Sequence, residues 1–575
     1  MLLRRLIASL AAPVLLTGCV TAQPAATAIK RPAAAAFDAG MVSAADPRAA
    51  EAGAEMLRAG GSATDAALAV LVTLNVVEPQ SSGIGGGGFL VVDDGKGGLE
   101  TLDGRETAPA AAHPRWFERD GKPLSISEAI PGGLSVGVPG NVRLMAEAHE
   151  RHGKLPWKQL FGPAIRTARE GFTITPRLHE YLNRSRGTAA LTPEGHALYY
   201  GTDGEPLPVG TTVRNPAFAA FLERLAAEGP ETFYDGANAA AIARAVSTAP
   251  RNPAPMKATD LAAYQAKPRG PVCTFYRRYR ICGMGPPSSG ATTVSGVLGL
   301  LERFDLTALG KDSPTAWHVI AEAQRLTYAD RERYLADSDF VSVPVSGLLS
   351  RDYLAARSRL ISPDKAIANV APGNPPGAPV AQADTLTPDI PSTSHFVVVD
   401  RDGQAVSLTS TIESAFGSGL MVNGYYLNNE LTDFSLAPER DGKPVANRVE
   451  PGKRPRSSMA PTLVYGPDGK LRLAVGAAGG ATIPAQVLRV IIGVIDWKLT
   501  AQDAIALPVI FAPGGDSVFI EQGSTLEAMI PALKALGHAE VAARELPLKT
   551  NAIEVIDGRL VGAADPRSEG RAISQ

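Results

Sequence analysis

The sequence predicts an α+β fold in which β-sheets lie against helices. Three observations support this prediction: β-hairpin patterns occur in both halves of the chain, helical patterns lie between them, and apolar segments recur throughout its 575 residues. Hydrophobic residues make up 45% of the chain and charged residues 20%, which is ordinary for a globular protein long enough for more than one domain. The net charge of −2 provides no basic field, so nucleic acid is not an expected partner.

Two helices are predicted early in the chain, over residues 46–59 and 62–76. Gly60-Gly61 separates them, because glycine commonly ends a helix, and Ser62 suits the N-cap of the second helix. This second helix is apolar almost all round, so we expect it to be buried. The other elements predicted in this half are strands near 88–93 and 99–103 and, within a mainly helical region at roughly 130–360, a clear helix at 316–326.

A stretch rich in proline, glycine and alanine, residues 366–392, predicts an exposed linker that ends at Thr393. A β-hairpin pattern begins at this threonine and turns at Asp402-Gly403, a strong hairpin signal. Further along, the pattern predicts a second hairpin with arms at 462–465 and 471–475, the glycine pair Gly479-Gly480, and a helix from about 483 to 495.

The position of Thr393 at the head of a strand suggests a catalytic role. If the chain were cut just before it, its hydroxyl could act as a nucleophile and its new α-amine, with an ordinary pKa of ~7.7–8.0, could act as the base. The alternative is a surface hairpin in which the threonine merely begins the strand.

The N-terminus is a predicted targeting segment. Arg4 and Arg5 precede an apolar run, residues 6–16, that is too short to span a membrane as a stable helix. The run leads to Cys19 in a context that resembles the bacterial lipobox, which implies a signal peptide over 1–18, a lipid on Cys19 and a flexible tether over 19–37. By the same resemblance Val20 favours a periplasmic protein anchored to the outer membrane; the alternative is an ordinary secretory signal.

Cys273 and Cys282 flank a segment that could fold as two short strands, so an oxidising periplasm would allow a disulfide across this hairpin. No histidine or further cysteine lies nearby at ligand spacing, and we expect no metal and no cofactor. The glycine-rich segment 83–88 satisfies a dinucleotide-binding pattern, but an apolar helix precedes it and a strand follows it. That order is the reverse of what the dinucleotide motif requires.

Seven segments together resemble the γ-glutamyltransferase (glutathione hydrolase) family of N-terminal-nucleophile hydrolases. They occur in family order around the hairpin headed by Thr393, and the resemblance spans about residues 37–575. The segments are Glu78–Phe89, Asp103–Pro109, Val136–Gly140, Gly285–Gly290, Leu427–Phe434, Pro455–Thr462 and Gly479-Gly480.

The resemblance implies a four-layer αββα sandwich formed jointly by two chains from one precursor. In it, Thr393 attacks the carbonyl of Ser392, which leaves a large subunit, 38–392, and a small catalytic subunit, 393–575, as a heterodimer. Thr393 then takes the acyl group from a γ-glutamyl amide such as glutathione, and water or an acceptor amino acid or peptide resolves the acyl-enzyme. Gly479 and Gly480 would bind the oxyanion, and Thr411 would hydrogen-bond the nucleophile.

The γ-glutamyl group carries an α-carboxylate and an α-ammonium, so its pocket needs both signs of charge. The resemblance assigns Arg105 to the carboxylate, because guanidinium can bind it with two hydrogen bonds, Ser457 and Ser458 to further hydroxyl contacts, and Glu430 and Asp433 to the ammonium. Glu413 departs from the family, since many members have asparagine there. With Glu430 and Asp433 it could put three carboxylates near one ammonium, which would raise at least one pKa.

Three alternatives stay open, and one of them, a periplasmic serine acylase, would remain active after Thr393→Ala. A cephalosporin or glutaryl acylase of the same superfamily would keep this machinery and change the acyl group, although a glutaryl group lacks the ammonium that Glu430 and Asp433 would bind. An unprocessed lipoprotein that binds γ-glutamyl compounds without turnover would remain a single chain.

Overall fold

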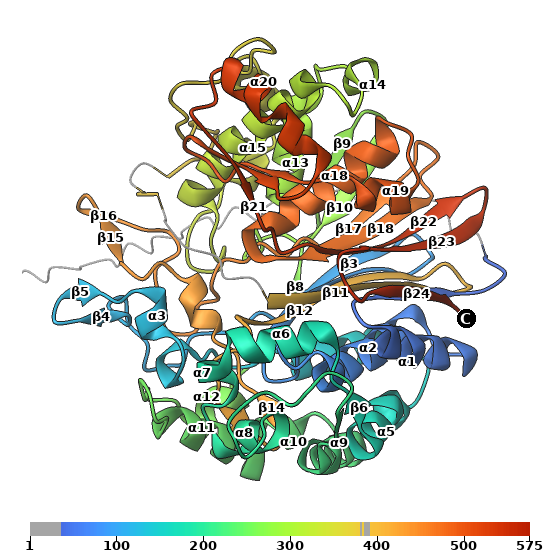
Figure 1. Ribbon diagram of the computed structural model, residues 1–575, viewed down its shortest axis with the longest axis vertical. Helices are drawn as coiled ribbons and strands as arrows, with labels where there is room; N and C mark the ends of the chain where they lie inside the picture. Colours follow the sequence, from blue (N-terminus) through green and yellow to red (C-terminus); the bar gives the residue numbers. More distant parts are fainter. Residues whose placement is uncertain (1–35, 380–381, 385–391) are drawn as a thin grey trace, which may run out of the picture.

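Two stacked antiparallel sheets form the centre of the computed structural model, which describes residues 36–379, 382–384 and 392–575 (Figure 1). The predicted signal peptide, Cys19 and all of the predicted tether except its last two residues lie outside the described part. The first sheet, in spatial order, consists of β24 (Arg571–Ser574), β1 (Met41–Ala44), β11 (Ser392–Val399), β12 (Ala405–Glu413), β2 (Gly87–Asp93), β3 (Leu99–Asp103) and β8 (Lys267–Arg269). The second consists of β23 (Arg559–Ala564), β22 (Lys549–Ile556), β18 (Leu471–Ala478), β17 (Thr462–Tyr465), β10 (Tyr279–Gly283) and β9 (Val272–Tyr276).

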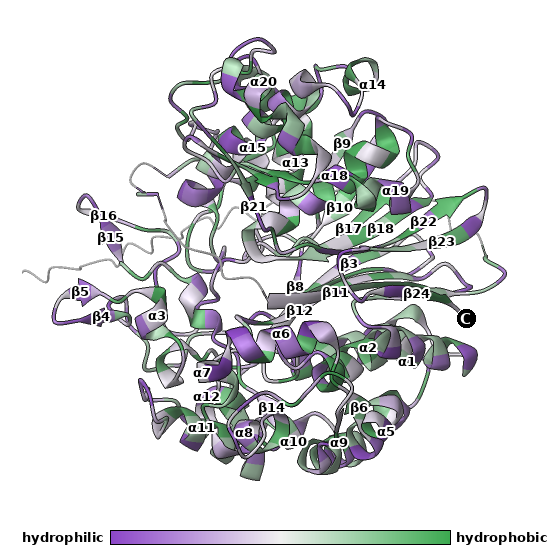
Figure 2. Cartoon of the chain, viewed as in Figure 1, coloured by the Kyte–Doolittle hydropathy of each residue, from purple (hydrophilic) through white to green (hydrophobic). Residues whose placement is uncertain are grey.

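Helices cover the outer face of each sheet, so the predicted α+β class is confirmed. Below the first sheet in Figure 1 lie α1 (Pro47–Arg58), α2 (Ala63–Val77), α4 (Asn141–His152), α5 (Gly162–Glu170), α6 (Pro176–Arg184), α9 (Pro216–Glu228) and α11 (Gly236–Ser247). Above the second lie α13 (Gly290–Leu301), α15 (Pro314–Tyr334), α18 (Ile483–Ile495), α19 (Ala501–Ala506) and α20 (Ile530–Ala535). Figure 2 shows that hydrophobic residues concentrate on the central strands β17, β18 and β22.

The local signals in the sequence correspond to real helix ends. The side chain of Ser62 caps α2 by accepting a hydrogen bond from the backbone N–H of Asp65, and every residue of this helix is buried, as its apolar pattern predicts. Asp46 caps α1 in the same manner. Among the described residues, no helix is long and apolar enough to cross a membrane.

The two hairpins around Thr393 and Thr462 form as predicted, with one difference at the first turn. The predicted tight turn at Asp402-Gly403 is instead a longer loop over residues 400–404. The Asp400 carboxylate stabilises this loop by accepting the N–H groups of Asp402 (3.0 Å) and Gln404 (2.9 Å). Gly403 has the positive φ, 83°, that this turn requires.

Among the described residues of the predicted linker at 366–392, those before Ser392 lie in no named helix or strand, whereas Ser392 already begins β11. The first half of the linker is held by contacts with α15. The Asp330 carboxylate accepts the Gly373 N–H at 2.7 Å, and the Tyr334 hydroxyl donates to the Gly373 carbonyl at 2.7 Å. Composition alone predicted exposure, because it carries no information about these contacts with α15.

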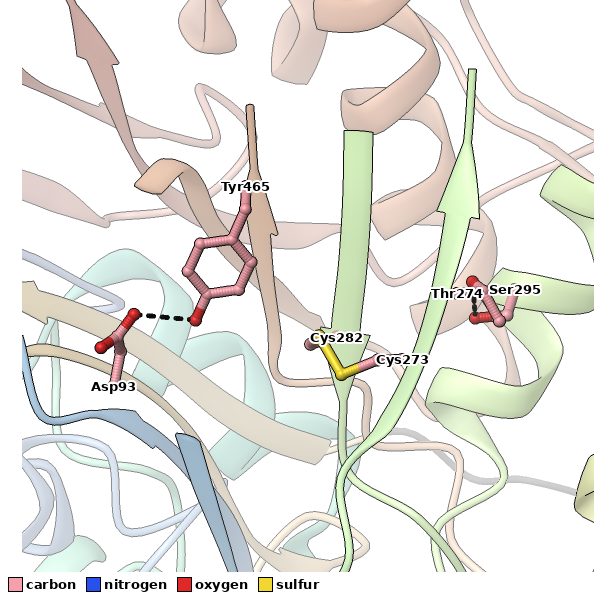
Figure 3. Close-up of a disulfide and its surroundings, with 6 residues drawn as sticks. All are labelled: Asp93, Cys273, Thr274, Cys282, Ser295 and Tyr465. Carbon is pink, nitrogen blue, oxygen red and sulfur yellow. Dashed lines mark hydrogen bonds between the residues drawn. A yellow bond between two sulfur atoms is a disulfide. The ribbon is translucent and has the colours of Figure 1, made fainter. Parts of the chain in front are cut away.

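A disulfide joins Cys273 of β9 to Cys282 of β10, which face each other directly in the ladder (Figure 3). Beside it, the Tyr465 hydroxyl of β17 donates to the Asp93 carboxylate of β2 at 2.9 Å and so connects the two sheets (Figure 3). The disulfide therefore holds the edge of the second sheet near a point where the sheets are joined.

Two buried neutral histidines make the stability of this fold sensitive to acid. Burial lowers the pKa of His395, in β11, to about 3, and burial together with the charges of His318 and Arg325 lowers the pKa of His538 to about 4. The unfolded chain binds protons at both sites below about pH 6.5, whereas the folded chain does not. The free energy of unfolding should therefore fall as the pH decreases from about 6.5 toward 4, by up to about 1.4 kcal/mol per pH unit for each histidine.

Urea unfolding between pH 7 and 5 tests this prediction. His395→Asn should reduce the pH slope of the unfolding free energy by about one proton, whereas His196→Gln, a change at an exposed histidine, should leave the slope as it is. An unchanged slope in the His395 variant would contradict the prediction.

Candidate active site

The pairing of β11 with β12 positions Thr393. Thr393 lies opposite Thr411, but Ser392 lies opposite Glu413, so the ladder contains a β-bulge at the Ser392–Thr393 bond. Glu413 has a positive φ of 75°, which is uncommon for a residue other than glycine. A bulge and an unusual backbone angle at one point re-aim the side chains there, as often happens beside active sites.

The hydroxyl of Thr411 connects the groups on both sides of this bond. It donates to the Ser392 carbonyl oxygen at 2.8 Å and accepts the Thr393 hydroxyl at 3.2 Å and the Glu413 N–H at 2.7 Å. A hydroxyl has one proton to donate and two lone pairs, so these three contacts use its full capacity. The arrangement polarises the Ser392 carbonyl and fixes the Thr393 hydroxyl next to it.

Gly479 and Gly480 lie between the end of β18 and the start of α18. Their φ angles are 138° and 58°, and a Cβ on Gly479 would lie 2.2 Å from the Pro547 carbonyl oxygen, so only glycine fits this close approach. Among the described residues, neither N–H donates a hydrogen bond to another group. Gly479 also lines the same depression as Thr393, which makes these N–H groups available to an oxyanion formed there.

Arg105 follows β3 and is the centre of a buried ion network. Its guanidinium donates to the carboxylates of Glu430 and Asp433, which lie on the short 3-10 helix η3 (Glu430–Asp433). It also donates to the carbonyls of Pro455 (3.2 Å) and Arg456 (3.1 Å) and is 1% exposed. The structure thus brings together the three residues that the sequence assigned to one charged pocket, but it pairs them with each other.

Carboxylates outnumber the guanidinium at this site. The ligand atoms of Glu413, Glu430 and Asp433 lie within 4.8 Å of one another. Glu106 is buried beside them, and burial together with the negative charge of Glu430 raises its pKa well above the ordinary value. Burial also raises the pKa of Glu430, which Arg105 opposes. The protonated form of Glu106 is therefore favoured more than that of an ordinary carboxyl group, and in that form it can donate to Glu430, whose Oε2 has no hydrogen-bond donor among the described residues.

The two predicted serines directly follow Arg456, whose carbonyl accepts a hydrogen bond from Arg105, but they differ in their contacts. The Ser458 hydroxyl accepts a hydrogen bond from Arg331 at 2.6 Å, and the Ser457 hydroxyl accepts the Met459 N–H at 3.2 Å. Both hydroxyls therefore accept a hydrogen bond from within the protein, which holds them in place.

Sequence reasoning missed three residues at or near this site. Glu106 stands directly after Arg105 in the family segment Asp103–Pro109. A carboxylate next to the arginine in this segment could have indicated that Glu106 belongs to the same charged site. Lys549 and Glu78 form a buried ion pair, with Nζ–Oε distances of 3.1 and 2.9 Å, near Thr393. No local pattern pairs them, because 471 residues separate them along the chain.

A second buried group of potential metal ligands, on His318, Glu322 and His538, lies apart from these residues. Arg325 donates to Glu322 at 2.6 Å there, just as Arg105 donates to Glu430 at the first group. In each case a guanidinium already supplies the cation that the carboxylate needs.

Comparisons with known proteins agree with these features. A family model described as gamma-glutamyltranspeptidase matches residues 49–575. The chain is 36% identical to the glutathione hydrolase proenzyme of Escherichia coli (strain K12) over 543 residues. This alignment covers 92% of this chain and 90% of that protein. It is 34% identical over 560 residues to the acylase ACY 1 proenzyme of Pseudomonas sp. (strain SE83), covering 95% of each. The solved structure of cephalosporin acylase from Bacillus halodurans superposes with a TM-score of 0.82 at 28% identity, covering 96% of this chain and 98% of that one.

Removal of the Arg105 charge should destabilise the fold strongly. Arg105→Met leaves two buried carboxylates without their cation, and the loss of one partner of a buried ion pair costs about 3–5 kcal/mol. Arg115→Met removes an exposed guanidinium that pairs with Glu118 at 3.1 Å and should cost about 1 kcal/mol or less. Urea unfolding of both variants measures the difference, and the double change Arg105→Met with Glu430→Gln should recover part of the loss. Equal costs for the two arginines would contradict the buried network.

Proposed function

Because this chain belongs to the gamma-glutamyltranspeptidase family, we propose that it is a self-cleaving γ-glutamyltransferase and glutathione hydrolase. Its substrates would be γ-glutamyl amides, cleaved through a γ-glutamyl ester on Thr393. The observation that carries the proposal is the Thr411 hydroxyl, which donates to the Ser392 carbonyl at 2.8 Å while it accepts the hydroxyl of Thr393.

Self-cleavage begins with attack by the Thr393 oxygen on the Ser392 carbonyl carbon. A carbon–oxygen bond forms, the carbon–nitrogen bond of the peptide breaks, and the nitrogen receives the proton that the hydroxyl loses. Water then hydrolyses the ester, which frees the Ser392 carboxylate and the Thr393 α-amine. The amide nitrogen cannot act as a base, but the amine can, so cleavage activates the enzyme.

The proposed subunits, 38–392 and 393–575, would remain assembled after cleavage. Each sheet contains strands from both proposed subunits. In the first sheet, β1, β2, β3 and β8 would come from the large subunit, and β12, β24 and all of β11 except Ser392 from the small one. In the second sheet, β9 and β10 would come from the large subunit, and β17, β18, β22 and β23 from the small one. The two chains would thus form the layered sandwich jointly. Lipid attachment at Cys19 and anchoring in the periplasm are part of the same proposal, supported by the N-terminal sequence alone.

In turnover, Thr393 attacks the γ-carbonyl of the substrate, and its α-amine takes the hydroxyl proton and passes it to the leaving amine. The tetrahedral oxyanion can accept the N–H groups of Gly479 and Gly480. Water or an acceptor amine then attacks the ester, which gives hydrolysis or transfer.

Recognition of the γ-glutamyl group follows from the Arg105 network as an exchange of partners. The α-carboxylate takes a place on Arg105 and the serine hydroxyls, and the α-ammonium takes a place on Glu430 and Asp433. Each internal ion pair is replaced by one with the substrate, so no charge is left buried without a partner. Glu413 adds a third carboxylate to the ammonium side, which strengthens the requirement for a cationic α-group.

That requirement favours γ-glutamyl donors over the glutaryl group of a cephalosporin acylase. A glutaryl chain has no ammonium, so Glu430 and Asp433 would keep Arg105 occupied. The likeness to acylases nevertheless makes glutaryl amides the right comparison substrates.

Self-cleavage is tested on a denaturing gel with N-terminal sequencing. The protein without its first 18 residues should yield a smaller band that begins at Thr393, Thr393→Ala should remain one chain, and Thr411→Val should cleave about tenfold or more slowly, since it loses the hydroxyl that polarises the Ser392 carbonyl. A smaller band with another first residue, or none in the unaltered protein, would remove the proposed nucleophile.

Donor recognition is tested with γ-glutamyl-p-nitroanilide and glutaryl-p-nitroanilide, with and without an acceptor dipeptide. Arg105→Lys should lower kcat/KM for the γ-glutamyl donor about ten- to hundredfold, because lysine cannot make the two parallel contacts of guanidinium. Faster cleavage of the glutaryl amide by the unaltered enzyme would favour the acylase, and unchanged kinetics in the variant would refute the role of Arg105.

A further inference from the structure

A second set of charged side chains lies beside the Ser392–Thr393 bond, separate from the Arg105 network. It lines a small depression whose walls include Thr393 and Gly479 together with Arg177, Tyr181 and Lys549. The depression therefore adjoins both the proposed nucleophile and a proposed oxyanion donor. None of the residues that line it contacts the Arg105 guanidinium, so it is a distinct neighbourhood of the same reacting group.

Lys549 contributes a buried charge that Glu78 balances. Its ammonium lies 3.1 and 2.9 Å from the two Glu78 oxygens and 3.4 Å from the Ser394 hydroxyl, which itself donates to Glu78 at 2.6 Å. The Gln486 side chain accepts the Lys549 backbone N–H at 3.0 Å and donates to the Ala478 carbonyl at 2.8 Å. Lys549 is thus held rigidly next to the Gly479 turn.

Arg177 contributes a second positive charge, which acts on Glu78 from a distance but forms no salt bridge among the described residues. It lies in the first turn of α6, and its guanidinium stacks 5.3 Å from the ring centre of Tyr181. Its buried Nε has no hydrogen-bond partner, and within the described part of the chain no carboxylate lies within salt-bridge distance of its guanidinium. The Glu569 carboxylate accepts the Arg177 backbone N–H, at 3.4 Å.

A pre-positioned guanidinium with unused donors is suited to bind a carboxylate. The attacked carbonyl carbon of a γ-glutamyl amide carries the acyl chain on one side and the leaving amine on the other. The Arg105 network matches the charges of the acyl chain, so the depression at Thr393 and Gly479 remains for the leaving amine.

We propose that Arg177, next to the Lys549–Glu78 pair, is a specificity-determining residue that binds the carboxylate of the leaving amino acid or peptide. This subsite rests on the proposed function and deepens it: the enzyme prefers γ-glutamyl amino acids and peptides to amides of uncharged amines. In transfer, the same guanidinium receives the carboxylate of an acceptor amino acid or peptide.

A matched pair of substrates tests the subsite on the processed enzyme. γ-Glutamyl-glycine and γ-glutamyl-glycinamide differ only in the terminal carboxylate, and the ratio of their kcat/KM values should be about tenfold or more in favour of the carboxylate. Arg177→Met should bring this ratio close to one, chiefly through a ten- to hundredfold loss on γ-glutamyl-glycine, as expected when a charge-assisted hydrogen bond is removed. Arg177→Lys should retain an intermediate ratio, because it keeps the charge but not the planar fork.

Arg184→Gln is the control, since Arg184 lies on the same helix but is exposed and pairs with Glu180 at 2.8 Å. Its ratio should equal that of the unaltered enzyme. A ratio near one in the unaltered enzyme, or a ratio that Arg177→Met does not change, overturns the subsite. The ratio in the unaltered enzyme is measured without any variant, so the proposal can be refuted even if Arg177→Met fails to fold.

γ-Glutamyl-p-nitroanilide separates failure of the subsite from failure of the proposed function, because its leaving group has no carboxylate. Cleavage of this compound with no preference within the glycine pair overturns the subsite alone. If neither it nor the glycine pair is cleaved, the γ-glutamyl function fails and the subsite fails with it.

Discussion

The hydrogen bond from the Thr411 hydroxyl to the Ser392 carbonyl is the contact on which the site depends. It exists because β11 and β12 pair with a bulge at the Ser392–Thr393 bond. Thr393 lies opposite Thr411, but the register shifts at the bulge, so that Ser392 lies opposite Glu413. A regular ladder would alternate the side chains on the two faces without this shift. The strand pairing therefore turns one of the peptide bonds of β11 into a polarised carbonyl with a hydroxyl beside it.

The charges around this bond follow from burial. Arg105, Glu430 and Asp433 are nearly inaccessible to water, so each charge needs a partner within the protein until a ligand supplies another. Burial beside Glu430 raises the pKa of Glu106, so this carboxyl group ionises less readily than an ordinary one. Buried ion pairs of this kind would suit the proposed γ-glutamyl ligand, which carries both a positive and a negative group.

Arg177 differs from this network in its exposure and in its unused donors. It lies at the surface end of α6 and is half-buried, so its charge can stay solvated until a ligand arrives. If both proposals hold, the acyl side of the reacting group would be bound by buried ion pairs that exchange partners, and the leaving-group side by a guanidinium stacked on Tyr181.

The sequence by itself determined the local elements and, through the family segments, predicted site roles for Thr393, Arg105 and the glycine pair. Hairpin turns, helix caps and apolar periodicity act over a few residues, so β11–β12, α2 and α18 could be predicted closely. Only the tertiary structure decided the order of strands in the two sheets, the pairing of Arg105 with Glu430 across 325 residues, and the approach of Lys549 and Arg177 to Thr393. These contacts join segments far apart in the chain, and no local pattern encodes which distant charge a buried side chain will meet.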